Sequence, residues 1–366
     1  MLQGLTVIGD LLRPDGRGSP GGVDRPTIWL FNAVKRQVAL ACGLPVSVLS
    51  TRHLPELAAA LMAERPFEHA ALHWAASYHR LADHASFNRH VLPRLRQQFC
   101  IGYELPPGLI AVLDAEAIPY IDLRIHPVRF LDDLLFAVRA SEPETQAALL
   151  DVAVAEAEVI ATAGLREAMC QMITDSPLPD DTLLVLGQRP MDATQIVAGR
   201  FFDAMDHVDR ITAICHSHRA ILLKPHPQEQ EHGLLVVAAG VARNLIGVTS
   251  DNLYRLLSLP MVTAVLTVNS SAAHEAAYFG KRDYTLAPRP VRLAWRGDTL
   301  ATDQHAAIDD RVLTPDFWRL VLAPHTSVSR SDGVRLTPKP NRLRIALDSF
   351  WNYQEIDTDR VPPRPR

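Results

Sequence analysis

Asn269–Ser271 lies where an apolar, β-branched run ends and a short amphipathic pattern begins. This order predicts a strand, a polar turn and the first turn of a helix. The free backbone N–H groups and the dipole of such a helix end suit a phosphate. Glu275 follows Ser271 on the same predicted helical face, where a carboxylate suits ribose hydroxyls. Helix capping by Asn269 or Ser270, with a solvated Glu275, explains the same residues.

A second polar corner comes earlier, where an apolar run ends at Lys224-Pro225-His226-Pro227. The two prolines restrict the backbone and remove two N–H donors. A lysine and a titratable histidine at a strand end suit a diphosphate or phosphodiester, because histidine can donate a hydrogen bond or a proton to a departing phosphate. A strand-ending loop with a surface histidine is the plainer interpretation.

Gly187 and Gln188 end the first predicted strand of the second half, and Asp192 follows in the next loop. Open α/β sheets bind ligands beyond the carboxyl ends of their strands. We therefore expect Asp192 to face a cleft. Taken alone, Asp192 is better explained as the cap of the next helix.

Two strand ends of the first half also carry polar groups. Glu104 ends one predicted strand, and Asp122, Arg124, His126 and Arg129 lie along and after the next. Glu104 suits a general acid or base if it is partly desolvated, because burial raises a carboxyl pKa. Ordinary strand-end residues with an internal Asp–Arg pair are the alternative.

The sequence does not favour a metal site. His216 and His218 lack a second ligand pair at useful spacing and suit a solvated helix surface. Asp357 and Asp359 form a DxD string, but it lies in a proline-rich tail and does not follow a strand. We therefore expect no metal and no other cofactor.

The spacing of apolar residues predicts the elements that position these groups. In the second half, strands alternate with helices, which favours a parallel sheet covered on both faces. We predict a helix near residues 197–205, one long helix from Ser141 to about Met172, and a flexible loop over residues 13–24. The irregular segment 175–181 predicts a boundary between two α/β domains with a cleft between them.

Length and composition fit that organisation. The chain has 366 residues, of which 48% are apolar and 21% charged, and a net charge of −4. These values are typical of a globular protein with a full core, and they argue against general nucleic-acid binding. The four cysteines are scattered, which favours a reduced, cytoplasmic protein. We see no signal peptide and no apolar run long enough for a membrane span.

Taken together and in this order, the segments resemble the retaining β-Kdo glycosyltransferases of bacterial surface polysaccharide synthesis. That family includes capsule-initiating enzymes and modules that cap certain O-antigens of lipopolysaccharide. The His-Pro and Ser-Ser elements also occur in CMP-sialic acid transferases, and the long segment 118–129 favours the O-antigen-capping type. The matching pieces are Gly102-Tyr103-Glu104, residues 118–129, Gly187-Gln188 with Asp192, Lys224 to Pro227, and Asn269 to Ser271 with Glu275.

The resemblance implies a GT-B fold, in which two Rossmann-like domains face a central cleft. It places the N-terminal, acceptor-side domain over residues 1–175 and the donor-binding domain over 182–330. A C-terminal helix over 340–355 would pack back on the N-terminal domain. It also implies CMP-β-Kdo as donor, net retention by double displacement, and no metal for the chemistry.

The resemblance also implies roles for individual residues. Asp192 would attack the anomeric carbon and form a glycosyl adduct, and Glu104 would exchange a proton with the acceptor hydroxyl. His226 would stabilise the departing phosphate. The remaining expected contacts are those of CMP with Gln188, Lys224, Asn269, Ser270, Ser271 and Glu275, and those of the Kdo carboxylate with Arg124, His126 and Arg129.

The resemblance further implies a polysaccharide or glycolipid acceptor, polysaccharide-assembly enzymes as partners, no nucleic acid, and a peripheral location at the cytoplasmic face of the bacterial inner membrane. Two other interpretations stay open. One is a different CMP- or CDP-dependent transferase, acting on sialic acid or glycerophosphate. The other is a non-catalytic glycan-binding module.

Overall fold

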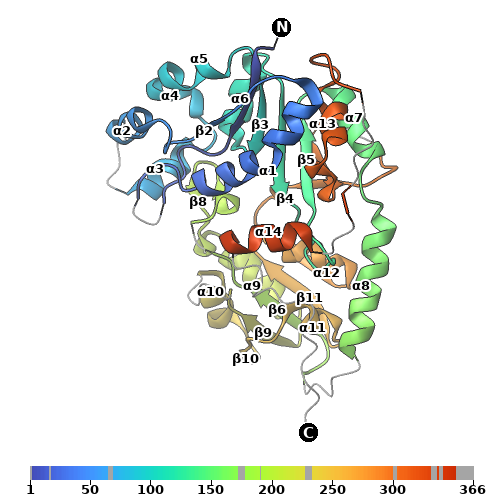
Figure 1. Ribbon diagram of the computed structural model, residues 1–366. Helices are drawn as coiled ribbons and strands as arrows, with labels where there is room; N and C mark the ends of the chain where they lie inside the picture. Colours follow the sequence, from blue (N-terminus) through green and yellow to red (C-terminus); the bar gives the residue numbers. More distant parts are fainter. Residues whose placement is uncertain are drawn as a thin grey trace.

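The computed structural model describes residues 2–15, 18–64, 69–171, 178–189, 191–226, 233–299, 303–330, 336–337 and 341–351. Within those residues, most strands belong to two sheets, one of seven strands and one of five. Figure 1 shows the larger sheet above the smaller one. Helix α8 (Glu156–Gln171) leads from the upper sheet down along the side of the lower one.

The larger sheet has the strand order β13-β14-β5-β4-β3-β1-β2. Strands β1 to β4 run parallel, and β5 is antiparallel to both of its neighbours. All five residues of β1 are buried, as expected for a parallel strand covered on both faces. The strands are β1 Gly4–Ile8, β2 Val46–Leu49, β3 Gln98–Tyr103, β4 Tyr120–Ile125, β5 Phe136–Ala140, β13 Arg292–Ala294 and β14 Gln304–Ile308.

Successive residues of these strands enter two different apolar cores, because side chains alternate across a sheet. Val7 and Ile101 pack in a core with α1 and α13, whereas Ile8 and Cys100 pack on the other face with Trp74. The helical elements around this sheet are α1 Asp24–Cys42, α2 Pro55–Ala63, α3 Ala70–Ser77, η1 Leu81–Asp83, α4 Ala85–His90, α5 Leu92–Leu95, α6 Pro107–Ala115, α7 Pro143–Asp151, η4 Asp310–Leu313 and α13 Pro315–Leu322.

The smaller sheet is parallel throughout, with the order β10-β9-β6-β11-β12. Its strands are β6 Thr182–Leu186, β9 Ala220–Lys224, β10 Leu245–Val248, β11 Val262–Thr267 and β12 Arg282–Thr285. The elements around it are η2 Ala193–Gln195, η3 Ala204–His207, α9 Val208–His216, α10 Gly233–Val241, α11 Leu253–Ser258 and α12 Ala272–Tyr278, and a separate hairpin is formed by β7 Ile196–Val197 and β8 Arg200–Phe201.

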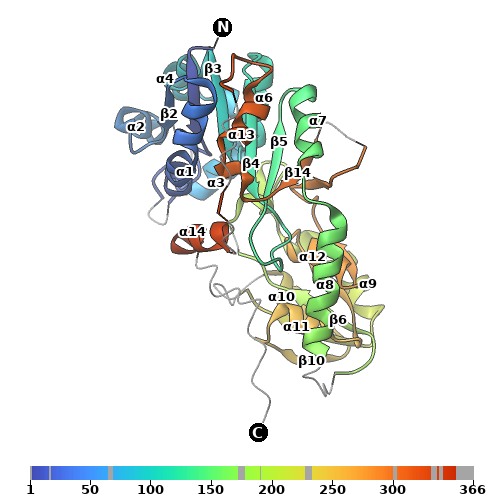
Figure 2. The same cartoon turned by 45° about the vertical axis from the view of Figure 1, so that its right-hand side comes forward.

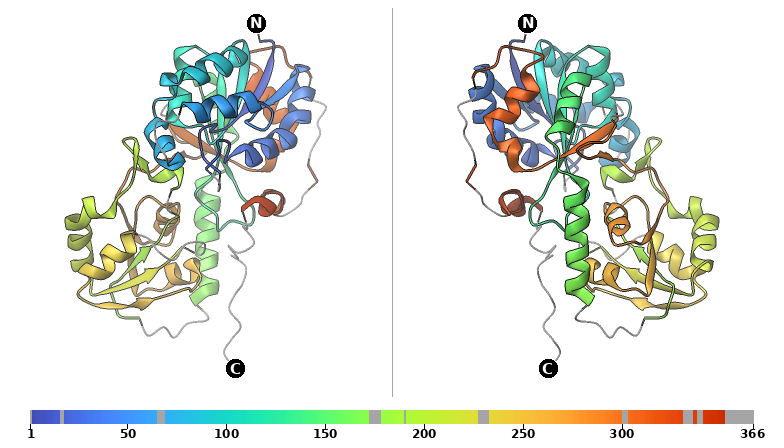
Figure 3. Two further views of the ribbon diagram at one scale, coloured as in Figure 1. Left: turned by 90° about the vertical axis from the view of Figure 1, so that its left-hand side faces the viewer. Right: turned by 90° about the vertical axis from the view of Figure 1, so that its right-hand side faces the viewer.

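The chain returns to the larger sheet after β12. Strands β13 and β14 join its edge beside β5, and α13 packs against α1. Their pairing differs from our expectation that residues 182–330 form one domain. Figure 3 shows these late segments, coloured orange to red, among the blue and cyan elements of the upper part. The predicted boundary at 175–181 lies partly outside the described residues.

The last described helix, α14 (Arg342–Trp351), lies below the larger sheet beside the loop between β4 and β5 (Figure 2). Leu343 is fully buried in the core shared with α1 and α13. The backbone N–H of Arg344 donates to Asp133 Oδ1 at 2.8 Å, and its guanidinium donates to the carbonyl of Arg129. The start of this helix is therefore held by the first half of the chain.

Two predicted helices were wrong. The chain near 197–205 forms the β7–β8 hairpin and η3, because Gly199 turns the backbone at a φ of 81°. The predicted long helix over 141–172 is divided into α7 and α8, because the N–H of Val154 donates to the carbonyl of Ala307 instead of continuing the helical ladder.

The mixed α/β class with parallel sheets is confirmed. Across the described ranges, no helix combines the length and apolar character of a membrane span.

Candidate functional site

Three neighbouring strands of the larger sheet end in polar groups at the same edge. The β1–β3 register pairs Ile8 with Gly102, and Asp10 and Glu104 each follow two residues later. The β3–β4 register pairs Gly102 with Asp122. The strand register thus brings Asp10, Glu104 and Asp122 to one edge of the sheet. The sequence pointed to Glu104 at this edge, gave Asp122 only as the internal partner of an arginine, and did not point to Asp10.

Asp10 holds the first residues of the loop after β1 through its side chain. Asp10 is 5% exposed, and its Oδ1 accepts from the backbone N–H groups of Leu12 and Arg13 at 3.1 and 3.2 Å. Its Oδ2 accepts from the indole Nε1 of Trp74 at 2.7 Å. The Arg13 guanidinium lies 5.3 Å from the centre of the Trp74 ring, in a cation–π contact.

Arg13 crosses to the smaller sheet and pairs with Asp192. Arg13 Nη2 lies 3.1 Å from Asp192 Oδ2, and the Arg13 side chain is 17% exposed. Asp192 Oδ1 accepts from the backbone N and the hydroxyl of Thr194 at 3.0 and 2.9 Å. Burial alone would raise the pKa of Asp192, but Arg13 and the Thr194 hydrogen bonds outweigh burial and lower that pKa below its ordinary value. Asp192 also caps η2, as the capping interpretation expected, and its position facing a cleft stays a prediction.

Glu104 shows the opposite shift. Burial raises the pKa of Glu104 above its ordinary value, although the nearby guanidiniums of Arg13 and Arg124 oppose it, and the charges of Asp192 and Asp122 add to the rise. The residue has a φ of 49°, in the left-handed region that non-glycine residues rarely adopt. Its backbone N–H donates to the carbonyl of Leu123 on β4 at 3.0 Å. The pKa values of two carboxyls near one arginine are therefore shifted in opposite directions.

Arg124 and Asp122 form an internal ion pair, which was the alternative interpretation of this segment. Arg124 Nε donates to Asp122 Oδ2 at 2.7 Å, and the Asp122 side chain is fully buried. The Arg124 guanidinium also donates to the carbonyl of Leu105, whose own N–H donates to Asp122 Oδ1 at 2.8 Å. The Arg124 side chain is 15% exposed, so part of the guanidinium is still open to a ligand.

Gln188 and Asn269 support the Asp192 loop from below. Gln188 Nε2 donates to Thr194 Oγ1 and to Asn269 Oδ1, both at 2.9 Å. The Asn269 amide in turn donates to the carbonyls of Thr194 and Pro288. Gln188 and Asn269 are buried, with 8% and 3% of their surfaces exposed. These bonds position Thr194 and so orient Asp192, and the expected contact of both amides with CMP stays a prediction.

The Lys224–His226 corner lies beside the end of β6. Gly187 N–H donates to the Lys224 carbonyl at 2.8 Å, and a Cβ added to Gly187 would lie 2.9 Å from the backbone N of His226. Lys224 Nζ donates to the Asp251 carbonyl at 2.6 Å, and burial lowers its pKa. The glycine lets the ends of β6 and β9 come close, so this corner adjoins the Gln188 network. Phosphate binding by Lys224 and His226 stays a prediction.

Ser270 and Ser271 occupy the turn before α12, as predicted. The Ser270 hydroxyl accepts from the N–H of Ala272 at 3.3 Å, and its carbonyl accepts from that of Ala273. Ser271 is the N-cap residue, and its side chain makes no capping bond to the helix. The local hydrogen bonds agree with the capping interpretation of Ser270, and phosphate binding by either serine stays a prediction.

Glu275 and Arg129 meet in a buried junction between the two halves of the chain. Glu275 Oε1 accepts from the Arg129 backbone N–H at 2.8 Å and from the Tyr254 hydroxyl at 2.9 Å, and the residue is 2% exposed. Burial raises the pKa of Glu275 to about 7. The contact joins α12 to the β4–β5 loop. The solvated Glu275 of the capping interpretation is wrong, and its contact with ribose stays a prediction.

His126 is fully buried beside Trp295, with ring centres 5.2 Å apart. Its Nδ1 accepts from the N–H of Val128 at 3.1 Å. Burial lowers the pKa of His126 to about 3, and the charge of His274 adds to this. The ring is therefore neutral at neutral pH and cannot offer a cation to the Kdo carboxylate in this conformation.

A pocket of about 470 Å³ is lined by residues from both halves of the chain, and neither Asp192 nor Glu104 is among its lining residues. Thr194 lines it from the smaller-sheet side, and Asp122 and Arg124 line it from the larger sheet. Arg139 and Arg289 add two further guanidiniums to its wall. Pockets of this size and mixed lining accommodate small ligands such as sugars. The pocket thus places cationic groups next to the Asp192 loop.

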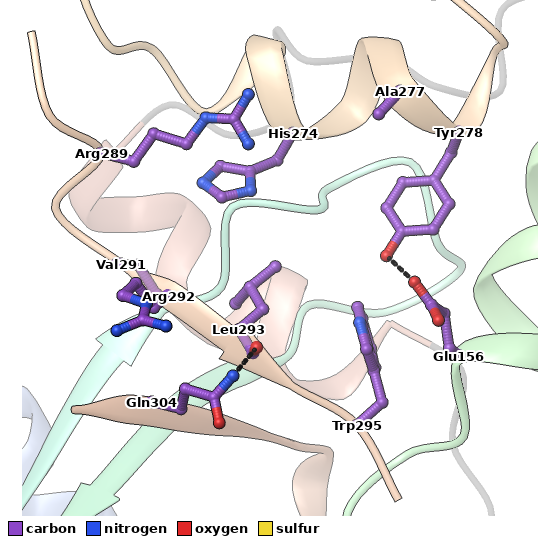
Figure 4. A pocket seen from close by; sticks show the side chains of 10 residues that line it. All are labelled: Glu156, His274, Ala277, Tyr278, Arg289, Val291, Arg292, Leu293, Trp295 and Gln304. Carbon is purple, nitrogen blue, oxygen red and sulfur yellow. Dashed lines mark hydrogen bonds between the residues drawn. The ribbon is translucent and has the colours of Figure 1, made fainter. Parts of the chain in front are cut away.

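A second pocket, of about 500 Å³, lies between α12 and β13 (Figure 4). His274 and Arg289 meet at one end, whereas Tyr278 donates from its hydroxyl to Glu156 at the other, at 2.9 Å. Burial lowers the pKa of His274 to about 4. Arg289 is common to both pockets and pairs with Asp283. None of the residues named as site candidates lines this second pocket.

In the described part of the chain, no group of three or more histidine, cysteine, aspartate or glutamate side chains has the geometry of a metal site. Sequence reasoning missed Arg13, Asp10 and Trp74. One signal for them was available, since Asp10 follows the first strand as Glu104 follows the third. The glycine- and proline-rich composition after Asp10 concealed it.

No family model matches this chain, and no sequence among the curated proteins matches it either. Among solved structures, one titled Thermosulfurimonas dismutans KpsC, beta Kdo 2,7 transferase, aligns with a TM-score of 0.37 and 11% identity. The alignment covers 81% of this chain and 97% of that one. A likeness this weak carries no argument about function, so the function is argued from the site.

Proposed function

We propose that this chain is a retaining glycosyltransferase that forms a covalent sugar adduct on Asp192. The observation that carries the proposal is the pair of carboxyls around Arg13. Arg13 and Thr194 lower the pKa of Asp192, which favours its ionised, nucleophilic form, whereas burial raises the pKa of Glu104. Double displacement needs one carboxylate to attack and a second group to move a proton.

The two oxygens of Asp192 differ in a way that suits this role. Oδ1 accepts two hydrogen bonds from Thr194, whereas Oδ2 accepts one from Arg13. A carboxylate oxygen has two lone pairs, so Oδ2 keeps one for the attack on the anomeric carbon. The CMP phosphate leaves with the bonding electrons, which needs no proton at that step. The acceptor hydroxyl then attacks the adduct, and its proton passes to Glu104.

The nature of the donor rests on the sequence resemblance. We propose CMP-β-Kdo, with the sugar in the 470 Å³ pocket and its carboxylate on Arg124. Lys224, His226, Ser270 and Ser271 would hold the phosphate of CMP. The two sheets would act as the two halves of a GT-B enzyme, peripheral to the cytoplasmic face of the inner membrane, with a lipopolysaccharide or capsule glycan as acceptor.

The adduct provides the test. Full-length protein is incubated with CMP-β-Kdo without acceptor, and its intact mass is measured. We expect a gain of one Kdo residue and release of CMP. Asp192→Ala should show neither, because the nucleophile is gone. Asp203→Ala is the matched control, since Asp203 is an exposed helix cap on the same connection between β6 and α9.

Each outcome has a meaning for the proposal. An adduct that persists in Asp192→Ala would show that another group attacks. Adduct formation with CMP-sialic acid but not CMP-Kdo would replace the donor and keep the chemistry. If neither CMP binding nor donor turnover occurs, a non-catalytic glycan-binding module becomes the better interpretation.

A further inference from the structure

Arg13 holds a fixed position between carboxyls of both halves of the chain. Its backbone N–H is bonded to Asp10, and its guanidinium lies against the Trp74 ring, which Asp10 also holds. The guanidinium reaches Asp192 Oδ2 at 3.1 Å. An arginine held at both its backbone and its side chain loses little further entropy when it changes partner locally.

Glu104 lies beside this arginine because of the strand register. Ile8 pairs with Gly102, so the chain segments that carry Asp10 and Glu104 leave adjacent strands together. The charged and titratable groups that act on Glu104 come from several elements. They are Arg13 after β1, Tyr78 after α3, Asp122 and Arg124 on β4, and Asp192 after β6.

Carboxyls outnumber guanidiniums in this cluster. Two guanidiniums, Arg13 and Arg124, face four carboxyls: Asp10, Glu104, Asp122 and Asp192. Ion pairs join Arg124 to Asp122 and Arg13 to Asp192. Asp10 and Glu104 are left without an arginine of their own, so at least one of them is easier to protonate.

We propose that Arg13 is a shared counter-ion that passes from Asp192 to Glu104 when Asp192 becomes an ester, and so converts Glu104 into the general base for the acceptor. This inference rests on the proposed function. In the first step, the Asp192 Oδ2–carbon bond forms and the carbon–phosphate oxygen bond breaks, with CMP taking the electron pair. Asp192 is now neutral, and Arg13 needs another anion.

Glu104 is the better recipient of that charge. Asp10 already accepts three hydrogen bonds from two backbone N–H groups and Trp74. Once Asp192 is neutral, Arg13 therefore favours the ionised form of Glu104, and any proton on Glu104 passes to solvent. In the second step, the acceptor oxygen bonds to the anomeric carbon and the carbon–Oδ2 bond breaks, returning the electron pair to Asp192. The acceptor proton moves to Glu104, and Arg13 returns to Asp192.

The first test needs no substrate. Asp192→Asn is neutral at the same position and so imitates the ester. The ionisation of Glu104 is followed by carbon-13 NMR of protein labelled at glutamate Cδ, with the signal assigned by its loss in Glu104→Gln. We expect the Glu104 titration midpoint to move to lower pH in Asp192→Asn.

Arg13→Gln isolates the contribution of the arginine. We expect Arg13→Gln to move the Glu104 midpoint further upward in the Asp192→Asn background than in the wild-type background, because the guanidinium then has Glu104 as its partner. Arg36→Gln, on the exposed face of α1, is the control and should change neither midpoint. An unchanged Glu104 midpoint in Asp192→Asn, or an equal effect of Arg13→Gln in both backgrounds, overturns the proposal.

The second test uses CMP-Kdo, and it can fail independently of the NMR test. Glu104→Gln should still form the adduct but discharge it to acceptor roughly a hundredfold or more slowly, within the usual range for losing a general base. Arg13→Gln should slow adduct formation and move its acidic limb to higher pH, and Arg13→Lys should restore part of both. If no protein forms an adduct while the NMR result holds, the shared counter-ion stands and the donor assignment fails. If Arg13→Gln slowed adduct formation equally at every pH, Arg13 would have only a structural role, and its proposed kinetic role would be overturned.

Discussion

Replacing Glu275 with glutamine tests whether the buried junction between α12 and the β4–β5 loop makes stability depend on pH. Burial raises the pKa of Glu275 from 4.5 to about 7. The folded protein thus holds a proton on Glu275 that the unfolded chain releases above about pH 4.5. Stability is highest below pH 4.5 for this group, falls as pH rises, and levels off above pH 7.

The size of this effect follows from the shift. From 4.5 to about 7 corresponds to about 3 kcal/mol in full, and most of it, roughly 2–3 kcal/mol, develops between pH 5 and pH 8. Glutamine does not titrate, and its carbonyl oxygen can still accept from the Arg129 N–H and the Tyr254 hydroxyl. We therefore expect the stability of Glu275→Gln to gain roughly 2–3 kcal/mol relative to wild type as the pH is raised from 5 to 8.

The assay is urea unfolding at a series of pH values, followed by tryptophan fluorescence, with wild type and variant compared at each pH. Glu144→Gln is the matched control, because Glu144 is exposed on α7 and should keep the wild-type pH profile. Parallel profiles for Glu275→Gln and wild type would refute the reasoning, since they would mean that Glu275 titrates alike in the folded and unfolded states.

Three further outcomes follow from the same structure. Burial lowers the pKa of His305 to about 3, so its neutral form stabilises the fold above pH 6.5, and this stability is lost as pH falls. In His305→Gln, the urea midpoint should therefore fall less between pH 6.5 and pH 4 than in wild type. An equal fall in both proteins would contradict this. Gly187→Ala should destabilise the protein by about 1–3 kcal/mol in thermal unfolding, because its Cβ would lie 2.9 Å from the His226 backbone N. Unchanged stability would mean that the backbone around His226 shifts to make room for the Cβ. Gln188→Ala should slow adduct formation about tenfold or more, because Gln188 positions Thr194, which in turn holds Asp192. A wild-type rate in this variant would show that Gln188 does not position Asp192 in this way.

Local patterns in the sequence were enough to predict the parallel strands and most of their order along the chain. Apolar runs such as 182–186 and 262–267 are buried on both faces, and such runs are readable without neighbours. The polar residues after such runs were singled out for the same reason, Glu104 directly after a predicted strand and Asp192 in the loop after one. Strands β13 and β14 were missed because they are short and because β14 pairs with β5, which lies far away in the chain.

The sequence by itself determined which residue types stand at the strand ends, because strand and turn preferences act over a few neighbours. Only the tertiary structure decided which of them lie close enough to form ion pairs. Arg13 and Asp192 are separated by 179 positions and lie on different sheets, yet their side chains are 3.1 Å apart. Burial and pairing then gave two similar carboxyls opposite pKa shifts, and those depend on distances that no local pattern contains.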